Sequence, residues 1–170
     1  MLSEEEIYET VDTEGRIIGH AARSQLHGNP SLIHRVVHVM VFNAEGSVLL
    51  QKRSMNKDIA PGRWDTSVGG HVNPGEDIRD AALREMREEL GIAIPDLQFR
   101  YSYLFRDHRE SELVNTFSCI CDEEVHFDRD EIDEVKFWSI DGIKAQIGKG
   151  VFSSHFEQEF EHYLQLIERQ

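Results

Sequence analysis

Apolar residues form seven short runs along the chain, and turn-forming or charged residues separate them. Runs rich in β-branched and aromatic side chains predict β-strands. The expected strands cover residues 7–11, 16–18, 33–42, 47–52, 97–105, 113–121 and 135–139. Gly15 and Gly46 end two of the intervening turns, where a positive φ favours glycine. The pattern therefore predicts a β-sheet over most of the chain.

Two segments show helical spacing instead. In the first, apolar residues share one arc at about 100° per residue. They are Ile78, Ala82, Leu83, Met86 and Leu90, with Pro74 and Gly75 before them and Gly91 after them. The second segment carries Phe156, Phe160, Tyr163, Leu164 and Ile167. Strands with packed helices predict an α+β fold, and the absence of any linker-like stretch predicts a single domain over residues 1–170.

An adjacent arc of the first helix carries three carboxylates. Glu85, Glu88 and Glu89 stand at i, i+3 and i+4, where like charges each cost the helix about 0.2–0.5 kcal/mol. Hard divalent cations such as Mg²⁺ and Mn²⁺ prefer oxygen ligands and share their other positions with water and substrate phosphates. We therefore predict a metal site on this arc. Arg84 points in a third direction and is expected to hold Glu88 or Glu76 in place.

The segment 70–92, GHVNPGEDIRDAALREMREELGI, resembles the Nudix box. Every defined position of that motif is filled, by Gly70, Glu76, Arg84, Glu85, Met86, Glu88, Glu89, Gly91 and Ile92. Most charge runs are solvated helix faces, but a match at every position is specific. The resemblance implies the Nudix-type α/β/α sandwich, in which a mixed β-sheet lies between helices.

The same resemblance implies a metal-dependent pyrophosphohydrolase that uses Mg²⁺ or Mn²⁺. Water would attack phosphorus and cleave a diphosphate bond in a nucleoside diphosphate derivative or in a nucleoside di- or triphosphate. Glu85, Glu88 and Glu89 would be the metal ligands, with Arg84 and Glu76 as supports. Glu85 is one candidate for the general base. The nucleoside, the leaving group and the number of metal ions stay open.

Residues 7–92 also resemble type I isopentenyl diphosphate isomerase, a relative of the Nudix hydrolases. The residues that carry this resemblance are His27, His34, Phe42, Asn43, Gly46, Arg53, Lys57, Pro61, Gly62, Trp64, Ser67, Val68, Gly70 and His71. His27, His34 and His71 match the metal-binding histidines of the isomerase and would suit Zn²⁺ or Mn²⁺. The expected substrate-binding residues are Arg23, Arg53 and Lys57, which match diphosphate-contacting positions, and the loop residue Gly70.

By this comparison two groups of the isomerase are missing. Its cysteine corresponds to Gly69, and its Glu-Asn-Glu is expected to correspond to Val114-Asn115-Thr116. The histidine site would then lack its two carboxylates, and protonation of an alkene would have no evident acid and base. We therefore favour hydrolysis. An isomerase-like enzyme and a non-catalytic nucleotide-binding module are the alternatives.

Other polar residues have no assigned role at this level. Many Nudix sites are completed by a distal carboxylate, for which the candidates are Glu110, Glu112, Glu131 and Glu134. The histidines without a recognisable partner in sequence are His108, His126, His155 and His162.

The chain is acidic, with 32 acidic and 18 basic residues and a formal charge of −14. This charge argues against nucleic-acid polymers and anionic membranes as partners, and favours a small-molecule diphosphate. A homodimer is left open. Cys119 and Cys121 lie too close in sequence for a convenient mutual disulfide and are expected to be buried thiols. The acidic amino terminus and the lack of long apolar runs predict a cytoplasmic protein.

Overall fold

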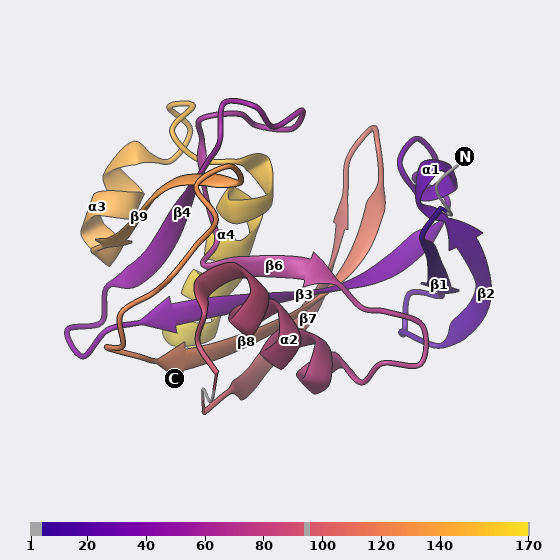
Figure 1. The fold of residues 1–170 in the computed structure, drawn as a ribbon, viewed down its shortest axis with the longest axis horizontal. Helices are drawn as coiled ribbons and strands as arrows, with labels where there is room; N and C mark the ends of the chain where they lie inside the picture. The colour runs from indigo at the N-terminus through magenta and orange to yellow at the C-terminus, as the bar shows by residue number, and fades with distance from the viewer. Residues whose placement is uncertain (1–4, 94–95, 170) are drawn as a thin grey trace.

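The computed structural model describes residues 5–93 and 96–169. Within these residues, one mixed β-sheet lies between helices (Figure 1). Its strands are β1 (Ile7–Val11), β2 (Ile17–Ala22), β3 (Ile33–Phe42), β4 (Val48–Arg53), β5 (Trp64–Asp65), β6 (Val68–His71), β7 (Gln98–Arg106), β8 (Ser111–Ile120) and β9 (Ile132–Trp138). The helices are α1 (Arg23–Leu26), α2 (Ile78–Leu90), α3 (Ile140–Gln146) and α4 (Ser154–Glu168).

Strand β3 organises the sheet, because it pairs with four other strands. It pairs in parallel with β8 along its whole length, and antiparallel with β1, β6 and β4 at successive positions. The parallel register places His34 beside Glu112. The antiparallel register with β6 places His38 beside Gly69. Residues that are far apart in sequence therefore meet on β3.

Helix α2 covers one face of the sheet. Its buried residues Ala82, Met86 and Leu90 join a core cluster with the valines of β3 that point to this face. The side chain of Asp77 caps the helix by accepting a hydrogen bond from the Arg79 backbone N–H at 2.9 Å. Gly91 ends it with a left-handed φ of 70°, which glycine adopts without strain.

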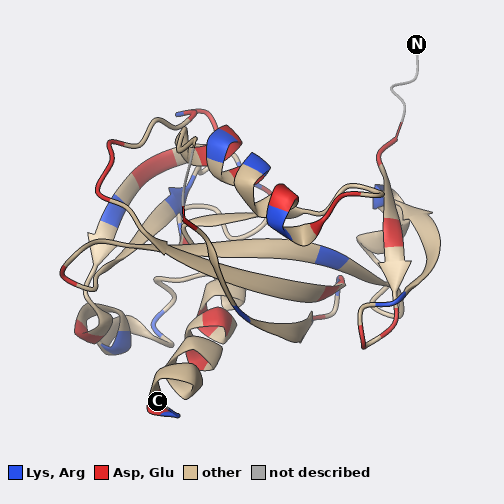
Figure 2. Cartoon of the chain, turned by 90° about the horizontal axis from the view of Figure 1, so that it is seen from below, with Lys and Arg blue, Asp and Glu red and all other residues tan. Residues whose placement is uncertain are grey.

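Helix α4 covers the opposite face, as Figure 2 shows. Phe156 and Phe160 pack with Met40 and Trp64 in a second core cluster. The Ser153 hydroxyl caps α4 by accepting a hydrogen bond from the Phe156 N–H. The two helices hold the sheet between them.

The expected mixed sheet between helices is confirmed. Strand β8 begins at Ser111, two residues before the expected start, and this difference changes the site described below. The segments β5, β6, α1 and α3 were not expected, because they are too short to show a period. Cys119 and Cys121 are both free, as expected; Cys119 is buried and Cys121 is partly covered.

No helix within the described residues is both long and apolar enough to cross a membrane.

Candidate active site

Glu85 lies against Gly70 in β6, a residue that was expected in a loop. A Cβ added to Gly70 would lie 2.2–2.6 Å from the carboxylate atoms of Glu85, which is closer than real side chains approach. Only glycine at this position allows the carboxylate to rest over the backbone of β6. The role of Gly70 seen in the structure is therefore to make room for Glu85.

Arg84 lies at the centre of the acidic face. Its guanidinium donates hydrogen bonds to both carboxylate oxygens of Glu76 at 2.9 Å and to the His71 carbonyl at 2.9 Å. It also donates to Glu85 at 2.8 Å and to Glu88 at 3.3 Å. The expected contacts with Glu76 and Glu88 are both present, and the contact with Glu85 adds to them. We use the name helix cluster for five residues: Glu76, Arg84, Glu85, Glu88 and Glu89.

The three predicted metal-binding glutamates have different environments. Glu88 is exposed, with 56% of its side chain accessible. Glu89 instead accepts hydrogen bonds from Gln51 Nε2 at 3.2 Å and from the Gly69 N–H at 3.1 Å. Burial, together with the nearby charge of Glu85, raises the pKa of Glu89 to about 8. A carboxylate in this position gains from a cation that offsets its charge.

The three predicted histidines also converge. The ring centroids of His34 and His71 are 5.1 Å apart, and that of His27 lies 6.2 Å from His71. Both ring nitrogens of His34 are buried and have no hydrogen-bond partner among the described residues. Burial, with the charge of His34 nearby, lowers the pKa of His71 to about 4, so this ring is neutral at physiological pH.

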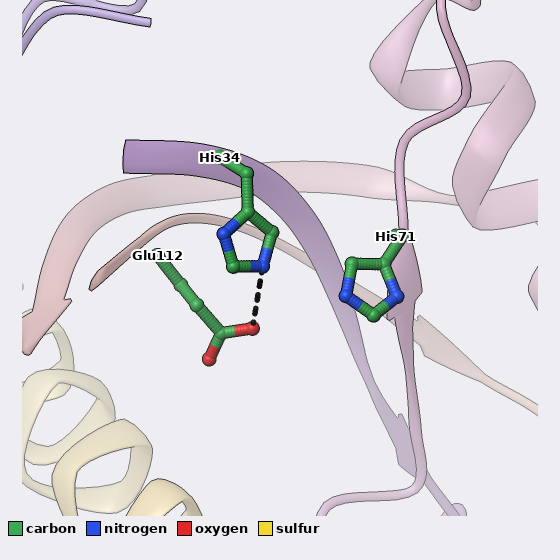
Figure 3. Close-up of side chains that lie close together, drawn as sticks. All are labelled: His34, His71 and Glu112. Atoms are coloured by element: carbon green, nitrogen blue, oxygen red, sulfur yellow. Dashed lines mark ion pairs between the residues drawn. The ribbon is translucent and has the colours of Figure 1, made fainter. Parts of the chain in front are cut away.

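Two carboxylates complete this group, contrary to the expectation from sequence. His34 Nε2 lies 3.6 Å from Glu112 and 3.9 Å from Glu110, and His27 Nε2 lies 3.5 Å from Glu110. Figure 3 shows His34, His71 and Glu112 turned toward one another from different strands. We call His27, His34, His71, Glu110 and Glu112 the histidine cluster.

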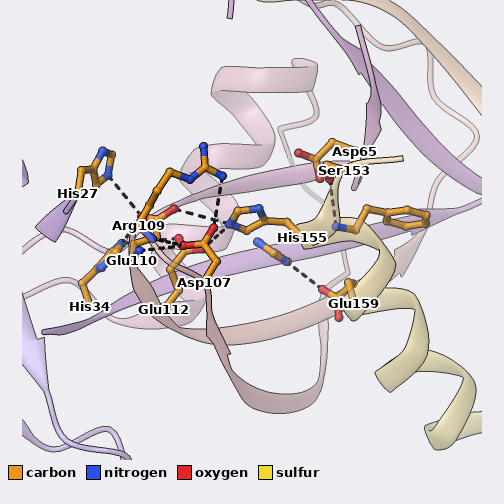
Figure 4. A network of polar contacts seen from close by, with 12 residues as sticks. His27, His34, Asp65, Asp107, Arg109, Glu110, Glu112, Ser153, His155 and Glu159 are labelled. Atoms are coloured by element: carbon orange, nitrogen blue, oxygen red, sulfur yellow. Dashed lines mark hydrogen bonds and ion pairs between the residues drawn. The ribbon is translucent and has the colours of Figure 1, made fainter. Parts of the chain in front are cut away.

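The expected correspondence with Val114-Asn115-Thr116 is therefore wrong. The pair of glutamates stands at Glu110 and Glu112, where β8 begins, and the parallel register sets Glu112 beside His34. The Asp107 carboxylate accepts the backbone N–H of Glu110 at 2.9 Å and shapes the turn before the strand (Figure 4). The Glu-x-Glu spacing was visible in the sequence, but the length of the turn that aligns it was not.

His155 is a residue of this site that the sequence did not indicate. It lies in the first turn of α4, and its Nε2 is 2.9 Å from Glu112 and 3.7 Å from Glu110. Its ring stacks on Phe105. Burial alone would lower the pKa of His155, but hydrogen bonding to Glu110 and Glu112 raises it to about 10. The imidazolium therefore pairs with the two carboxylates when no metal does.

The two clusters open into one cleft, a cavity of about 240 Å³. Its lining includes Glu89 from the helix cluster and His27, His71, Glu110 and Glu112 from the histidine cluster. Larger cavities elsewhere, of about 420 and 720 Å³, bring no comparable group of histidines and carboxylates together, so volume alone does not identify the site. The cleft is the place where residues of both clusters meet.

The expected phosphate-binding residues lie around this cleft. Arg53 lines it and donates to the Ile59 carbonyl at 2.8 Å, and Arg23 lines it while pairing with Glu6 at 3.3 Å. Lys57 lines a neighbouring cavity of about 300 Å³ with Glu88 and Glu89, and pairs there with Glu131. Each of the three cations therefore has a partner within the chain.

Comparison with known proteins gives a consistent result. The family model described as NUDIX domain matches residues 32–156. A protein of Mycolicibacterium vanbaalenii described as isopentenyl-diphosphate Delta-isomerase is 37% identical over 133 residues, which cover 75% of this chain and 74% of that protein. The uncharacterized Nudix hydrolase PA4841 of Pseudomonas aeruginosa is 33% identical over 135 residues, 79% of each chain.

Among solved structures, DR0079 from Deinococcus radiodurans superposes with a TM-score of 0.80 at 22% identity. The superposition covers 92% of this chain and 98% of DR0079. At this identity the similarity concerns the fold alone.

Proposed function

The chain belongs to the NUDIX domain family of hydrolases that act on phosphoric anhydride bonds, and from this premise we propose that it is a metal-dependent pyrophosphohydrolase. The proposed substrate is a nucleoside diphosphate derivative or a nucleoside di- or triphosphate. The observation that carries the proposal is the complete helix cluster, whose partly buried member Glu89 lines a cleft together with Arg23 and Arg53.

The donor chemistry of the helix cluster fits a hard cation. Glu85, Glu88 and Glu89 offer carboxylate oxygens, and they would hold Mg²⁺ or Mn²⁺. When bound, such an ion would neutralise diphosphate charge and lower the pKa of a water molecule. The cluster also contains its own cation, because Arg84 donates to Glu85 and Glu88. The acids are thus held in place before any ligand arrives.

The other residues of the cleft orient the carboxylates and would bind the phosphate groups of the substrate. Gln51 and the Gly69 N–H hold the carboxylate of Glu89, and Arg84 holds that of Glu85. Arg53 and Arg23 would bind phosphate oxygens by exchanging their present partners for them. Glu85 is the candidate for the group that removes a proton from the attacking water, since its carboxylate lies against Gly70, which lines the cleft.

The histidine cluster fits a second, separate metal ion. The unpartnered ring nitrogens of His34 and the low pKa of His71 leave imidazole lone pairs free, and Glu110 and Glu112 supply oxygen. Mixed nitrogen and carboxylate donors suit Mn²⁺ or Zn²⁺. We propose that His27, His34, His71, Glu110 and Glu112 hold this ion beside the one at the helix cluster.

A second candidate function is isomerisation of an isopentenyl diphosphate type of substrate. The specific observation in its favour is the presence of Glu110 and Glu112 in the histidine cluster, which removes one of the two objections from sequence. The other objection stands, because Gly69 provides no thiol. Proton transfer to carbon then lacks its acid, so hydrolysis is preferred.

One assay separates these functions. The purified chain, stripped of metal with a chelator, is supplied with Mg²⁺ or Mn²⁺ and incubated with a panel of nucleoside di- and triphosphates, nucleotide sugars, dinucleotides and isopentenyl diphosphate. We expect metal-dependent release of phosphate or a nucleoside monophosphate, which Glu89→Gln abolishes.

An isomerised carbon product would overturn the proposal in favour of the second candidate. Metal-dependent binding without turnover of any substrate would instead favour a non-catalytic nucleotide-binding module.

A further inference from the structure

A buried polar cluster lies under the cleft, on the α4 side of the sheet. Its centre is Glu159, whose side chain is 0% exposed. Glu159 accepts a hydrogen bond from Tyr101 Oη at 2.6 Å and from Thr116 Oγ1 at 2.9 Å, and His38 Nδ1 lies 3.1 Å from its Oε1. Figure 4 shows Glu159 on α4 with its carboxylate turned toward the sheet. None of the predicted metal ligands takes part in these contacts.

The three contacts place a proton on Nδ1 of His38. An ionised carboxylate only accepts hydrogen bonds, and burying it without donors is costly. Tyr101 and Thr116 supply two donors, so His38 supplies the third through Nδ1–H. The other nitrogen, Nε2, is then directed away from Glu159. A buried glutamate that orients a histidine in this way is a common arrangement at reactive sites.

His38 lines the cleft beside Gly69. His38 and Gly69 are register partners on β3 and β6, and both line the cavity. A Cβ on Gly69 would lie 3.5 Å from Nε2 and 3.2 Å from Cδ2, so the missing side chain leaves room beside this edge of the ring, although His38 as a whole is only 7% exposed. Within residues 5–93 and 96–169, no hydrogen-bond partner is recorded for Nε2.

The same glycine connects His38 to the helix cluster. The Gly69 N–H donates to Glu89 at 3.1 Å, so Glu89 and His38 approach this residue from its two sides. A diphosphate held at the helix cluster would therefore lie within reach of Nε2. Burial alone would lower the pKa of His38, but the hydrogen bond and charge of Glu159 raise it, which favours the imidazolium form.

We propose that His38 is a catalytic residue that donates a hydrogen bond from Nε2 to a phosphate oxygen of the substrate. The donor stabilises the negative charge that develops on the departing phosphate, and Glu159 is its positioning residue. This inference rests on the proposed diphosphate hydrolysis. Removing one donor aimed at a developing charge lowers turnover by about 100- to 1,000-fold in comparable sites.

Two substitutions of His38 separate this role from a structural one. The amide nitrogen of Asn occupies the place of Nδ1, and that of Gln the place of Nε2. His38→Asn keeps the donor to Glu159 and removes Nε2. His38→Gln does the reverse.

We expect His38→Asn to lower kcat by about 100-fold with little change in KM, and His38→Gln to retain more turnover. Glu159→Gln should lower kcat by a smaller factor than His38→Asn, because the ring stays but is less well oriented. If His38→Asn turns over like the wild type while His38→Gln loses stability and activity, His38 is structural and the proposal fails.

A binding experiment tests the contact without turnover. Histidine side-chain nitrogen signals are recorded by ¹H–¹⁵N NMR for the wild type with Mg²⁺ alone and then with Mg²⁺ and methylenediphosphonate. The Nε2 signal of His38 is the one missing in His38→Asn, and we expect it to shift on adding the diphosphonate. Glu159→Gln should reduce this shift.

The two experiments fail in different ways. A wild type that hydrolyses no diphosphate but shows the Nε2 shift would overturn the proposed function and leave the contact in place. A wild type that hydrolyses diphosphates without any shift of the Nε2 signal would overturn the role of His38 alone.

Discussion

The helix cluster and the histidine cluster lie on one cleft but are built in opposite ways. The helix cluster comes from residues 76–89, and a guanidinium already satisfies most of its carboxylates. The histidine cluster draws on the segment after α1 and on β3, β6 and the start of β8, and it leaves both nitrogens of His34 without a partner. In the first cluster Arg84 offsets the charge of three carboxylates, whereas in the second the ring nitrogens of His34 have no hydrogen-bond partner among the described residues.

This difference indicates how each cluster would bind an ion. Arg84 keeps the acids of α2 in position, so an ion there can be held jointly with a substrate and released with the product. Buried imidazoles without hydrogen bonds are costly and are expected where an ion resides permanently. His155 reduces that cost in part by pairing with Glu110 and Glu112.

The largest expected effect comes from breaking the helix cluster. Glu89→Gln should lower turnover by at least about 100-fold, because the cation would lose one of its proposed carboxylate ligands. The unfolding temperature should not fall, since the change removes repulsion with Glu85 and keeps the shape of the side chain. Steady-state kinetics and thermal unfolding check both statements.

Glu161→Gln is the matched control, because Glu161 is exposed on α4 and away from the cleft. Unfolding of Glu89→Gln alone would show that this carboxylate is structural.

Breaking the histidine cluster should affect a different property. His27→Gln should weaken Mn²⁺ or Zn²⁺ binding by at least about tenfold, because one ligand is lost. Mg²⁺ binding at the helix cluster should stay close to that of the wild type. Isothermal titration of the metal-free chain with each ion measures both affinities.

His20 is exposed on β2 and outside the cluster, so His20→Gln serves as the control. Equal loss of Mg²⁺ and Mn²⁺ affinity in His27→Gln would mean that the two clusters form one site.

Substitution of Arg84, the cationic side chain of the helix cluster, tests the comparison further. Arg84→Ala should lower the free energy of unfolding by about 1–3 kcal/mol in metal-free buffer, because Glu76 and Glu85 lose their donor. Added Mg²⁺ should restore part of this loss, which denaturant titration measures. Arg87→Ala is the control, since Arg87 is exposed on the same helix. A loss that Mg²⁺ does not reduce would separate Arg84 from the metal site.

The effect of Arg84 should also depend on pH. Hydrogen bonds from Arg84 hold the pKa of Glu76 below its ordinary value of 4.5. A carboxyl group whose pKa is lower in the folded chain than in the unfolded chain stabilises the fold when the pH lies above both values. This contribution is lost as the pH falls through the pKa of the folded chain. The difference between the wild type and Arg84→Ala should therefore be largest near neutral pH and shrink in acid. A difference that grows on acidification would contradict this account.

The smallest effect is expected for Glu88. Its side chain is largely exposed and its contact with Arg84 is the longest of that residue's bonds to the helix glutamates. Glu88→Gln should change the free energy of unfolding by no more than about 0.5 kcal/mol. It should lower turnover less than Glu89→Gln does. A larger loss than that of Glu89→Gln would reverse the order of the two ligands.

The sequence by itself determined the helix cluster, the layered α+β fold and the family. The reason is that i, i+3 and i+4 neighbours on a helix are set by local geometry, so Glu85, Glu88 and Glu89 could be placed together without any other part of the chain. Arg84 was expected to reach Glu88 or Glu76 from another direction on the helix, and its contact with Glu85 came only from the structure. The single-domain extent, a homodimer and a cytoplasmic location remain predictions.

Only the tertiary structure decided the histidine cluster and the His38–Glu159 contact. Both depend on the register of β3 with β6 and β8 and on the packing of α4, which strand pairing and turn length set together. A shift of a few residues at the start of β8 was enough to turn Glu110 and Glu112 from unassigned acids into partners of His34. Contacts between strands that are distant in sequence leave no periodic pattern of residues, so they cannot be predicted from the pattern along the chain.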